Sequence, residues 1–219
     1  MAERHFDLIV FDWDGTLFDS TAMIARCIQD ACVDLGLPMP SLDAASYVIG
    51  LGLQDALMHA APSLPRERYR ELALRYRHHY QARQHELVLF TGAFDLLQAL
   101  RARRHLLAVA TGKSRAGLDE ALASARMRDL FDATRTADET APKPDPKMLH
   151  ELMDELGADP ARTLMIGDTT HDLQLAANAG AASLAVSYGA HAPDAFDGFA
   201  TRHVAASVAD LERWLLAHG

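Results

Sequence analysis

The stretch that decides the fold reads Phe6-Asp7-Leu8-Ile9-Val10-Phe11-Asp12-Trp13-Asp14-Gly15-Thr16. Its first six residues form a short apolar run with branched side chains, which predicts a buried β-strand. The run passes directly into two aspartates and a glycine, a combination that is typical of a turn. The sequence therefore predicts a strand that carries Asp12 and Asp14 at its carboxyl end.

Strand and helix patterns alternate in the second half of the chain. Apolar runs at residues 106–111, 163–166 and 182–187 are separated by helical segments, with weaker strand signals at 132–136 and near His203. Such alternation is typical of a parallel sheet that is covered by helices on both faces. We therefore expect an α/β protein with a Rossmann-like, doubly wound parallel sheet.

Residues 18–85 follow a different pattern, because every predicted element there is helical. This segment is too long for an ordinary crossover between two neighbouring strands. We expect it to form an all-helical domain, inserted after the first strand into an α/β core made of residues 1–17 and 86–219.

Composition limits the classes of partner. The 219 residues include 30 acidic and 21 basic side chains, for a formal charge of −9. This balance argues against binding to nucleic acid or to an anionic membrane surface, and no apolar run is long enough to span a bilayer. The two cysteines, Cys27 and Cys32, lie in a predicted helix without a cluster of partners, so we expect a reduced, cytoplasmic setting.

Polar residues stand where three of the predicted strands end. These residues are Asp12, Thr111 and Asp168. In open α/β sheets, ligands bind beyond the carboxyl ends of the strands, so we expect these side chains to meet. Lys143 lies in a proline-rich loop that can reach the same edge, although Lys147 is close enough to be a rival.

Four segments together resemble the motifs of the haloacid dehalogenase superfamily. They are Asp12–Thr16, Thr111, the loop around Lys143, and Gly167–Asp172. The helical insert resembles the cap of the phosphoglycolate-phosphatase-like branch. The resemblance implies a Mg²⁺-dependent phosphatase that acts on a small phosphorylated metabolite, such as a phosphoglycolate-like compound or a sugar or nucleotide phosphate, through an aspartyl-phosphate.

The chemistry of phosphoryl transfer agrees with the residues of these motifs. Asp12 can be the nucleophile and Asp14 the general acid and base. Lys143 and the Thr111 hydroxyl can stabilise charge on the phosphate oxygens. Asp12 and Asp168 offer the oxygen ligands that Mg²⁺ prefers, and the family adds the backbone carbonyl of Asp14.

Three further positions have both a functional and a structural interpretation. The resemblance implies that Asp172 orients Lys143 or a metal-bound water, but Asp172 can also simply cap a helix. Gly50 lies in a loop that selects the substrate in relatives, or it only ends a helix. Gly112 is a candidate for substrate binding, although it stands where many relatives have asparagine and so removes a side-chain donor. His171 is expected to be a solvent-facing loop residue.

Other reactions of the superfamily differ in particular residues. Relatives that cleave carbon–halogen bonds lack the second carboxylate, so Asp14 argues for phosphate chemistry. Relatives that cleave phosphonates use a cap lysine, and residues 18–85 contain none. A β-phosphoglucomutase-like phosphomutase and a catalytically inactive binding protein stay open as alternatives, and neither the substrate nor the oligomeric state follows from the motifs.

Overall fold

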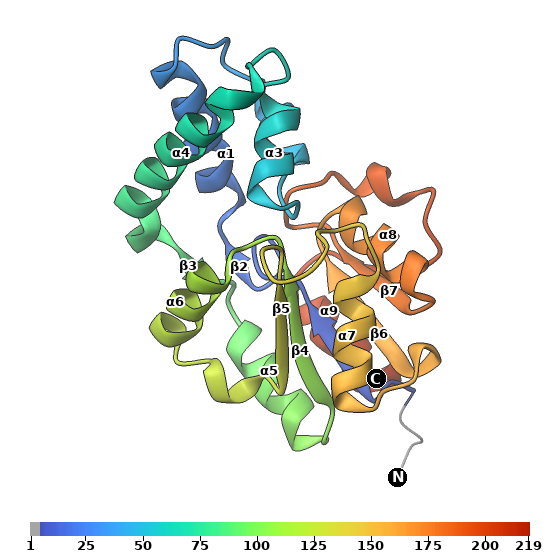
Figure 1. Cartoon of the computed structure of the whole chain (residues 1–219). Coiled ribbons are helices and arrows are strands. Elements are labelled where there is room, and N and C mark those ends of the chain that lie inside the picture. Colours follow the sequence, from blue (N-terminus) through green and yellow to red (C-terminus); the bar gives the residue numbers. More distant parts are fainter. Residues whose placement is uncertain (1–4) are drawn as a thin grey trace.

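The architecture is a parallel six-stranded sheet beneath a group of helices, as a computed structural model describes it for residues 5–219 (Figure 1). The strands are β1 (Leu8–Phe11), β4 (Leu106–Thr111), β5 (Ala133–Thr136), β6 (Thr163–Gly167), β7 (Ala182–Val186) and β8 (Thr201–Ala205). Their order in the sheet is β5-β4-β1-β6-β7-β8, and every pair is parallel. This order confirms the predicted doubly wound α/β fold, with β1 between the two halves.

Helices cover both faces of the sheet. The helices of the core are α5 (Ala93–Ala102), α6 (Arg115–Ala125), α7 (Lys147–Leu156), α8 (Thr170–Ala179) and α9 (Val208–His218). Because successive side chains of a strand point to opposite faces, Ile9 and Phe11 pack in a cluster with α5, α6 and α9, whereas Leu8 and Val10 pack with α7 and α8. All four side chains are fully buried, which explains why this strand reads as a continuous apolar run.

The insert lies beyond the carboxyl ends of the strands (Figure 1). Its helices are α1 (Thr21–Asp34), α2 (Leu42–Tyr47), α3 (Leu53–Ala60) and α4 (Tyr69–Arg83). Side chains of α1, α2 and α3 and of the α2–α3 loop form an apolar cluster of their own, with Tyr76 and Tyr80 of α4 packed against it. The insert therefore has a core separate from that of the sheet.

Two short strands that the sequence did not predict connect the insert to the sheet. β2 (Phe18–Asp19) pairs antiparallel with β3 (Val88–Leu89). The 3₁₀ turn η1 (Arg66–Arg68) leads directly into α4, which begins at Tyr69. The other 3₁₀ turns are η2 (Gln84–Glu86), η3 (Arg128–Leu130), η4 (Pro160–Arg162) and η5 (Pro193–Phe196). Within residues 5–219, the helices are all too short or too polar to cross a membrane.

Candidate active site

Two neighbouring strand ends and the first turn of α8 place a cluster of buried carboxylates at the centre of the sheet edge. Asp12 follows β1 and Asp168 follows β6, the neighbouring strand. Asp172 lies in the first turn of α8. All three are buried, and each offers an oxygen within 4.8 Å of the others. The topology thus brings together side chains that are about 160 positions apart in the chain.

Lys143 reaches this cluster from the loop before α7. Its ammonium nitrogen lies 2.9 Å from Asp12 Oδ1 and 2.7 Å from Asp172 Oδ1, and its side chain is wholly buried. Burial alone would lower the pKa of Lys143, but the two carboxylates outweigh that effect and raise the pKa. The two carboxylates thus favour the charged form of Lys143. Its rival Lys147 is exposed and pairs only with Glu151 among the described residues.

Asp12 has one oxygen that is satisfied and one that is not. Oδ1 accepts a hydrogen bond from the backbone N–H of Trp13 at 2.7 Å and pairs with Lys143. Oδ2 is buried, and no described residue donates a hydrogen bond to it. Burial raises the pKa of Asp12 to about 7, while Lys143 opposes the rise. A buried carboxylate oxygen without a donor is costly, and a bound cation would relieve that cost.

Asp168 is held by its neighbours on two sides. Its Oδ1 accepts from the Thr16 hydroxyl at 2.9 Å, and its Oδ2 accepts from the Ala190 N–H at 2.7 Å. Burial and the charges of Asp12 and Asp172 raise the pKa of Asp168 well above its ordinary value. Gly15 has a φ of +76°, and a Cβ there would collide with Asp168. A side chain at this position would therefore displace the carboxylate.

Asp172 contacts Lys143 and also caps α8, so the structure contains both arrangements that the sequence left open. Its Oδ2 accepts from the N–H and the hydroxyl of Thr169, which completes a capping box at the start of α8. Its Oδ1 accepts from Lys143. Both oxygens of Asp172 are thus engaged, as are those of Asp168, so Asp12 is the member of this cluster that has an oxygen without a described donor.

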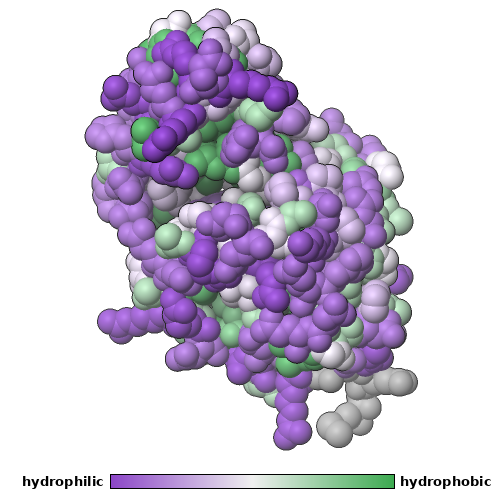
Figure 2. Space-filling model, viewed as in Figure 1, coloured by the Kyte–Doolittle hydropathy of each residue, from purple (hydrophilic) through white to green (hydrophobic). Residues whose placement is uncertain are grey.

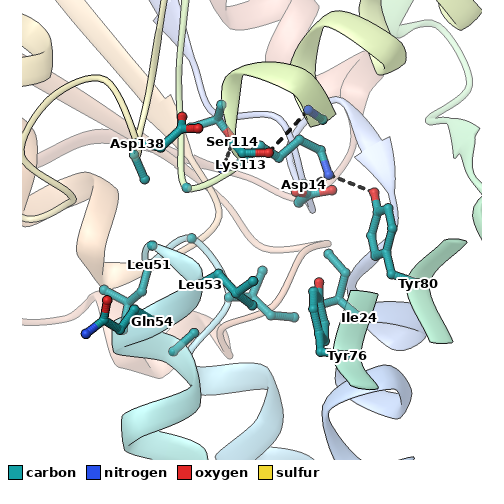
Figure 3. Close-up of a pocket in the computed structure, with 18 of the residues that line it drawn as sticks. Asp14, Ile24, Leu51, Leu53, Gln54, Tyr76, Tyr80, Lys113, Ser114 and Asp138 are labelled. Atoms are coloured by element: carbon teal, nitrogen blue, oxygen red, sulfur yellow. Dashed lines mark hydrogen bonds and ion pairs between the residues drawn. The ribbon is translucent and has the colours of Figure 1, made fainter. Parts of the chain in front are cut away.

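Asp14 forms a second buried ion pair, with Lys113 (Figure 3). The Lys113 nitrogen lies 2.9 Å from Asp14 Oδ2 and donates to the Tyr80 hydroxyl at 2.8 Å. The Ser20 hydroxyl donates to Asp14 Oδ1 at 2.8 Å. The sequence did not predict a place in the site for Lys113, Tyr80 or Ser20. The signal for Lys113 was its place two residues after Thr111 in a chain with three lysines, whereas no sequence signal links Tyr80 of α4 to this edge.

Thr111 is buried at the end of β4 and lines a cavity that also contains Asp12 and Asp14. Its hydroxyl accepts from the Lys113 N–H at 3.3 Å. The residue that caps α6 is Ser114. Thr111 therefore does not cap the helix that follows it.

The α2–α3 loop of the insert lies directly over this edge. A Cβ at Gly112 would collide with the Leu51 carbonyl oxygen and come within 2.7 Å of the Gly50 carbonyl oxygen. A Cβ at Gly50 would lie 3.8 Å from Asp12 Oδ2. Gly112 thus permits a close approach of two backbone segments, and Gly50 lies next to the carboxylate cluster.

His171 differs from its prediction as a solvent-facing loop residue. It lies in α8 and is buried, and its Nε2 is 2.8 Å from the Tyr47 carbonyl oxygen. His191 Nε2 lies 3.0 Å from the same oxygen. Burial lowers the pKa of both histidines. The sequence could not reveal this arrangement, because Tyr47 belongs to the insert, more than 120 residues away.

A cavity of about 940 Å³ separates the insert from the core and opens above Asp12 and Asp14. Figure 2 shows apolar atoms inside a hollow between the upper helices and the rest of the molecule. A pocket of this kind, with a few convergent polar groups and a carboxyl group of raised pKa in Asp12, is the usual setting of an active site.

Comparisons with known proteins agree with this geometry. A protein of Dickeya dadantii (strain 3937) named "Probable phosphatase IndB" is 39% identical over 195 residues, which cover 85% of this chain and 84% of the relative. A phosphoglycolate phosphatase of Aliivibrio fischeri is 35% identical over 192 residues, which cover 83% of this chain and 84% of the relative. The crystal structure of a hydrolase from Pseudomonas syringae shares the fold, with a TM-score of 0.87 at 22% identity over 95% of this chain and 97% of the other.

The family model described as "Haloacid dehalogenase-like hydrolase" matches residues 9–186. This range contains both aspartates after β1, Thr111, Lys143 and Asp168. The protein therefore belongs to the haloacid dehalogenase-like hydrolases.

Proposed function

We propose that this protein is a Mg²⁺-dependent phosphatase that hydrolyses a small phosphate monoester through an aspartyl-phosphate on Asp12. The observation that carries the proposal is the environment of Asp12. One of its oxygens is buried without a donor among the described residues, beside Asp168, while Lys143 neutralises the other. The phosphatase names of the two relatives described above support the same reaction.

The carboxylates fit a Mg²⁺ ion, because Mg²⁺ prefers oxygen ligands and needs only one or two carboxylates besides water and phosphate. Asp12 Oδ2 and Asp168 would hold it, together with the backbone carbonyl of Asp14. When bound, the ion would neutralise negative charge on the phosphoryl oxygens. This assignment also gives a reason why Asp12 and Asp168 are buried side by side, where burial raises the pKa of both carboxyl groups.

The first half of the reaction transfers the phosphoryl group to the protein. The Asp12 carboxylate attacks phosphorus while the bond from phosphorus to the alcohol oxygen breaks. Asp14 donates a proton to that oxygen, so that a neutral alcohol leaves. Lys143 and Thr111 hold the equatorial oxygens of the phosphoryl group.

The second half returns the protein to its starting state. Asp14, now a carboxylate, takes a proton from water as the water oxygen attacks phosphorus. The bond from phosphorus to Asp12 breaks, and inorganic phosphate leaves. The helical insert over Asp12 limits the access of bulk water during both steps.

We also propose the division of the chain into a core of residues 1–17 and 86–219 and a cap of residues 18–85. The separate apolar cluster of the insert supports this division. A cytoplasmic location is proposed because Cys27 and Cys32 are both free and buried.

The test is phosphate release from ethyl phosphate and 4-nitrophenyl phosphate in the presence of Mg²⁺. We expect Asp12→Asn to abolish release while the circular dichroism spectrum stays unchanged. Asp43→Asn, at an exposed position on α2, is the matched control and should keep full activity. Full turnover by Asp12→Asn would contradict the mechanism, and conversion of a sugar phosphate to its isomer without free phosphate would favour the mutase.

A further inference from the structure

We infer that the cavity above Asp14 binds the alcohol part of the substrate, and that this part is uncharged, apolar and about the size of an aromatic ring. The inference rests on the proposed function and names its substrate class. It follows from the position, lining, charge and volume of the cavity.

Asp14 fixes which part of the substrate enters the cavity. In the proposed reaction Asp14 protonates the oxygen of the leaving alcohol, so that oxygen must lie beside its carboxylate. Asp14 lines the cavity, and Figure 3 shows side chains of the insert facing it and Lys113 across the open space. The carbon atoms attached to that oxygen therefore extend toward the insert.

The wall that those carbon atoms meet is mainly apolar. It is formed by α1, the α2–α3 loop, the start of α3 and α4. The apolar side chains that face the cavity are Ile24, Ile28, Val48, Ile49, Leu51, Leu53 and Tyr76, and the polar amides of Gln54, Gln81 and Gln84 share the lining with them. Contact with the apolar side chains stabilises an apolar group, whereas hydroxyl groups of a sugar placed against them would lose their water without gaining partners.

The charges around the cavity argue against an anionic substituent on the alcohol. Among the described residues that line it, the basic ones are Lys113 and Arg77. Lys113 is engaged by Asp14 and Tyr80, and Arg77 is exposed. Besides Asp12 and Asp14, three acidic side chains share the lining with them, namely Asp55, Glu120 and Asp138, of which Glu120 and Asp138 are exposed like Arg77. A carboxylate such as that of phosphoglycolate would meet more negative charge than positive charge here.

The volume of the cavity also favours an alcohol larger than a two-carbon one. About 940 Å³ lies at the upper end of the range for pockets that bind drug-sized molecules. A two-carbon alcohol would leave most of the apolar wall in contact with water, whereas a ring would cover Leu53 and Tyr76. The structure thus favours a larger apolar alcohol.

Binding of phosphonates tests the inference without requiring turnover. We expect 2-phenylethylphosphonate to bind at least about tenfold more tightly than ethylphosphonate in calorimetry with Mg²⁺, since ring burial is worth at least that much. Phosphonoacetate should bind no more tightly than ethylphosphonate. Equal affinities for the first two compounds, or tighter binding of phosphonoacetate, would overturn the inference.

Turnover of the matching esters separates this inference from the proposed function. 2-Phenylethyl phosphate and ethyl phosphate release alcohols of similar acidity, so their kcat/KM values compare binding of the alcohol part and not its leaving ability. We expect the phenylethyl ester to be the better substrate. If neither ester releases phosphate while the phosphonate preference holds, the proposed function fails and the apolar subsite stands.

A charge introduced among the apolar side chains of the cavity tests whether they contact the alcohol part of the substrate. Leu53→Asp should reduce the preference for 2-phenylethylphosphonate over ethylphosphonate to less than about threefold, because it puts a carboxylate against the ring position. Leu74→Asp makes the same change at an exposed leucine of α4 outside the cavity, and it should leave the preference unaltered. An unchanged preference in Leu53→Asp, with the circular dichroism spectrum of the wild type, would overturn the inference.

Discussion

The ammonium nitrogen of Lys113 lies 2.9 Å from Asp14 Oδ2, and Lys113 also donates to the hydroxyl of Tyr80 in the insert. The orientation of the proposed general acid therefore depends on a residue of α4. This contact connects the position of the insert to the chemistry at the sheet edge.

Replacement of Lys113 by methionine should lower kcat for ethyl phosphate by about tenfold or more, since a misplaced catalytic group costs rate even when substrate binds. Tyr80→Phe removes only the hydroxyl that holds Lys113 and should have a smaller effect in the same direction. Steady-state kinetics measure both, with Lys147→Met as the control at an exposed lysine. Wild-type kcat in Lys113→Met would show that the ion pair does not position Asp14.

Loss of Lys143 should destabilise the fold as well as abolish activity. Lys143→Met leaves Asp12 and Asp172 buried without their cation, and breaking such a buried pair typically costs roughly 3–5 kcal/mol. Urea unfolding in metal-free buffer measures the free energy of unfolding. Lys147→Met, which removes an exposed lysine, should change it by less than about 0.5 kcal/mol. Equal stabilities of the two variants would contradict the buried network.

Close backbone contact at Gly112 should be required for activity and not for folding. Gly112→Ala forces the Gly50–Leu51 segment away from the sheet edge, so we expect kcat/KM to fall by about tenfold. Gly198→Ala is the control, because a Cβ there meets no atom within 4 Å. Unchanged kcat/KM in Gly112→Ala would show that the loop does not need to approach the site.

Mg²⁺ should stabilise the folded protein through Asp168. A ligand at one hundred times its Kd stabilises by about 2.7 kcal/mol, so Mg²⁺ should raise Tm in thermal unfolding. Asp168→Asn should abolish the Mg²⁺-dependent increase in Tm, and the exposed-site variant Asp43→Asn should retain it. An increase of the same size in Asp168→Asn would remove Asp168 from the metal site.

Much of the fold could be predicted, because local patterns determine it. The apolar runs at β1, β4 and β6 are buried on both faces and read as strands from their composition alone. β2 and β3 could not be predicted, because each has only two residues. Each strand forms only by pairing with the other, about 70 positions away in the chain. Strands of that length leave no periodic pattern.

The candidate site likewise contains residues that the sequence could predict and residues that it could not. Asp12 and Asp168 could be located because each stands directly after a predicted strand, and topology then brings them together. Tyr80, His171 and His191 depend on contacts between the insert and the core, which no local pattern encodes. Trp13 illustrates the same limit, since its position between Asp12 and Asp14 does not reveal that it is buried in the sheet core against Phe18.

The most direct measurement is peptide mass spectrometry of the Asp14→Asn variant, quenched in acid after mixing with 4-nitrophenyl phosphate and Mg²⁺. Nitrophenol leaves readily without a proton donor, but water attack on the intermediate requires Asp14 as the base. We therefore predict that the peptide containing Asp12 gains the mass of one phosphoryl group, and that Asp12→Asn/Asp14→Asn does not. A phosphoryl group found on another residue, or on none while nitrophenol is released, would contradict the account.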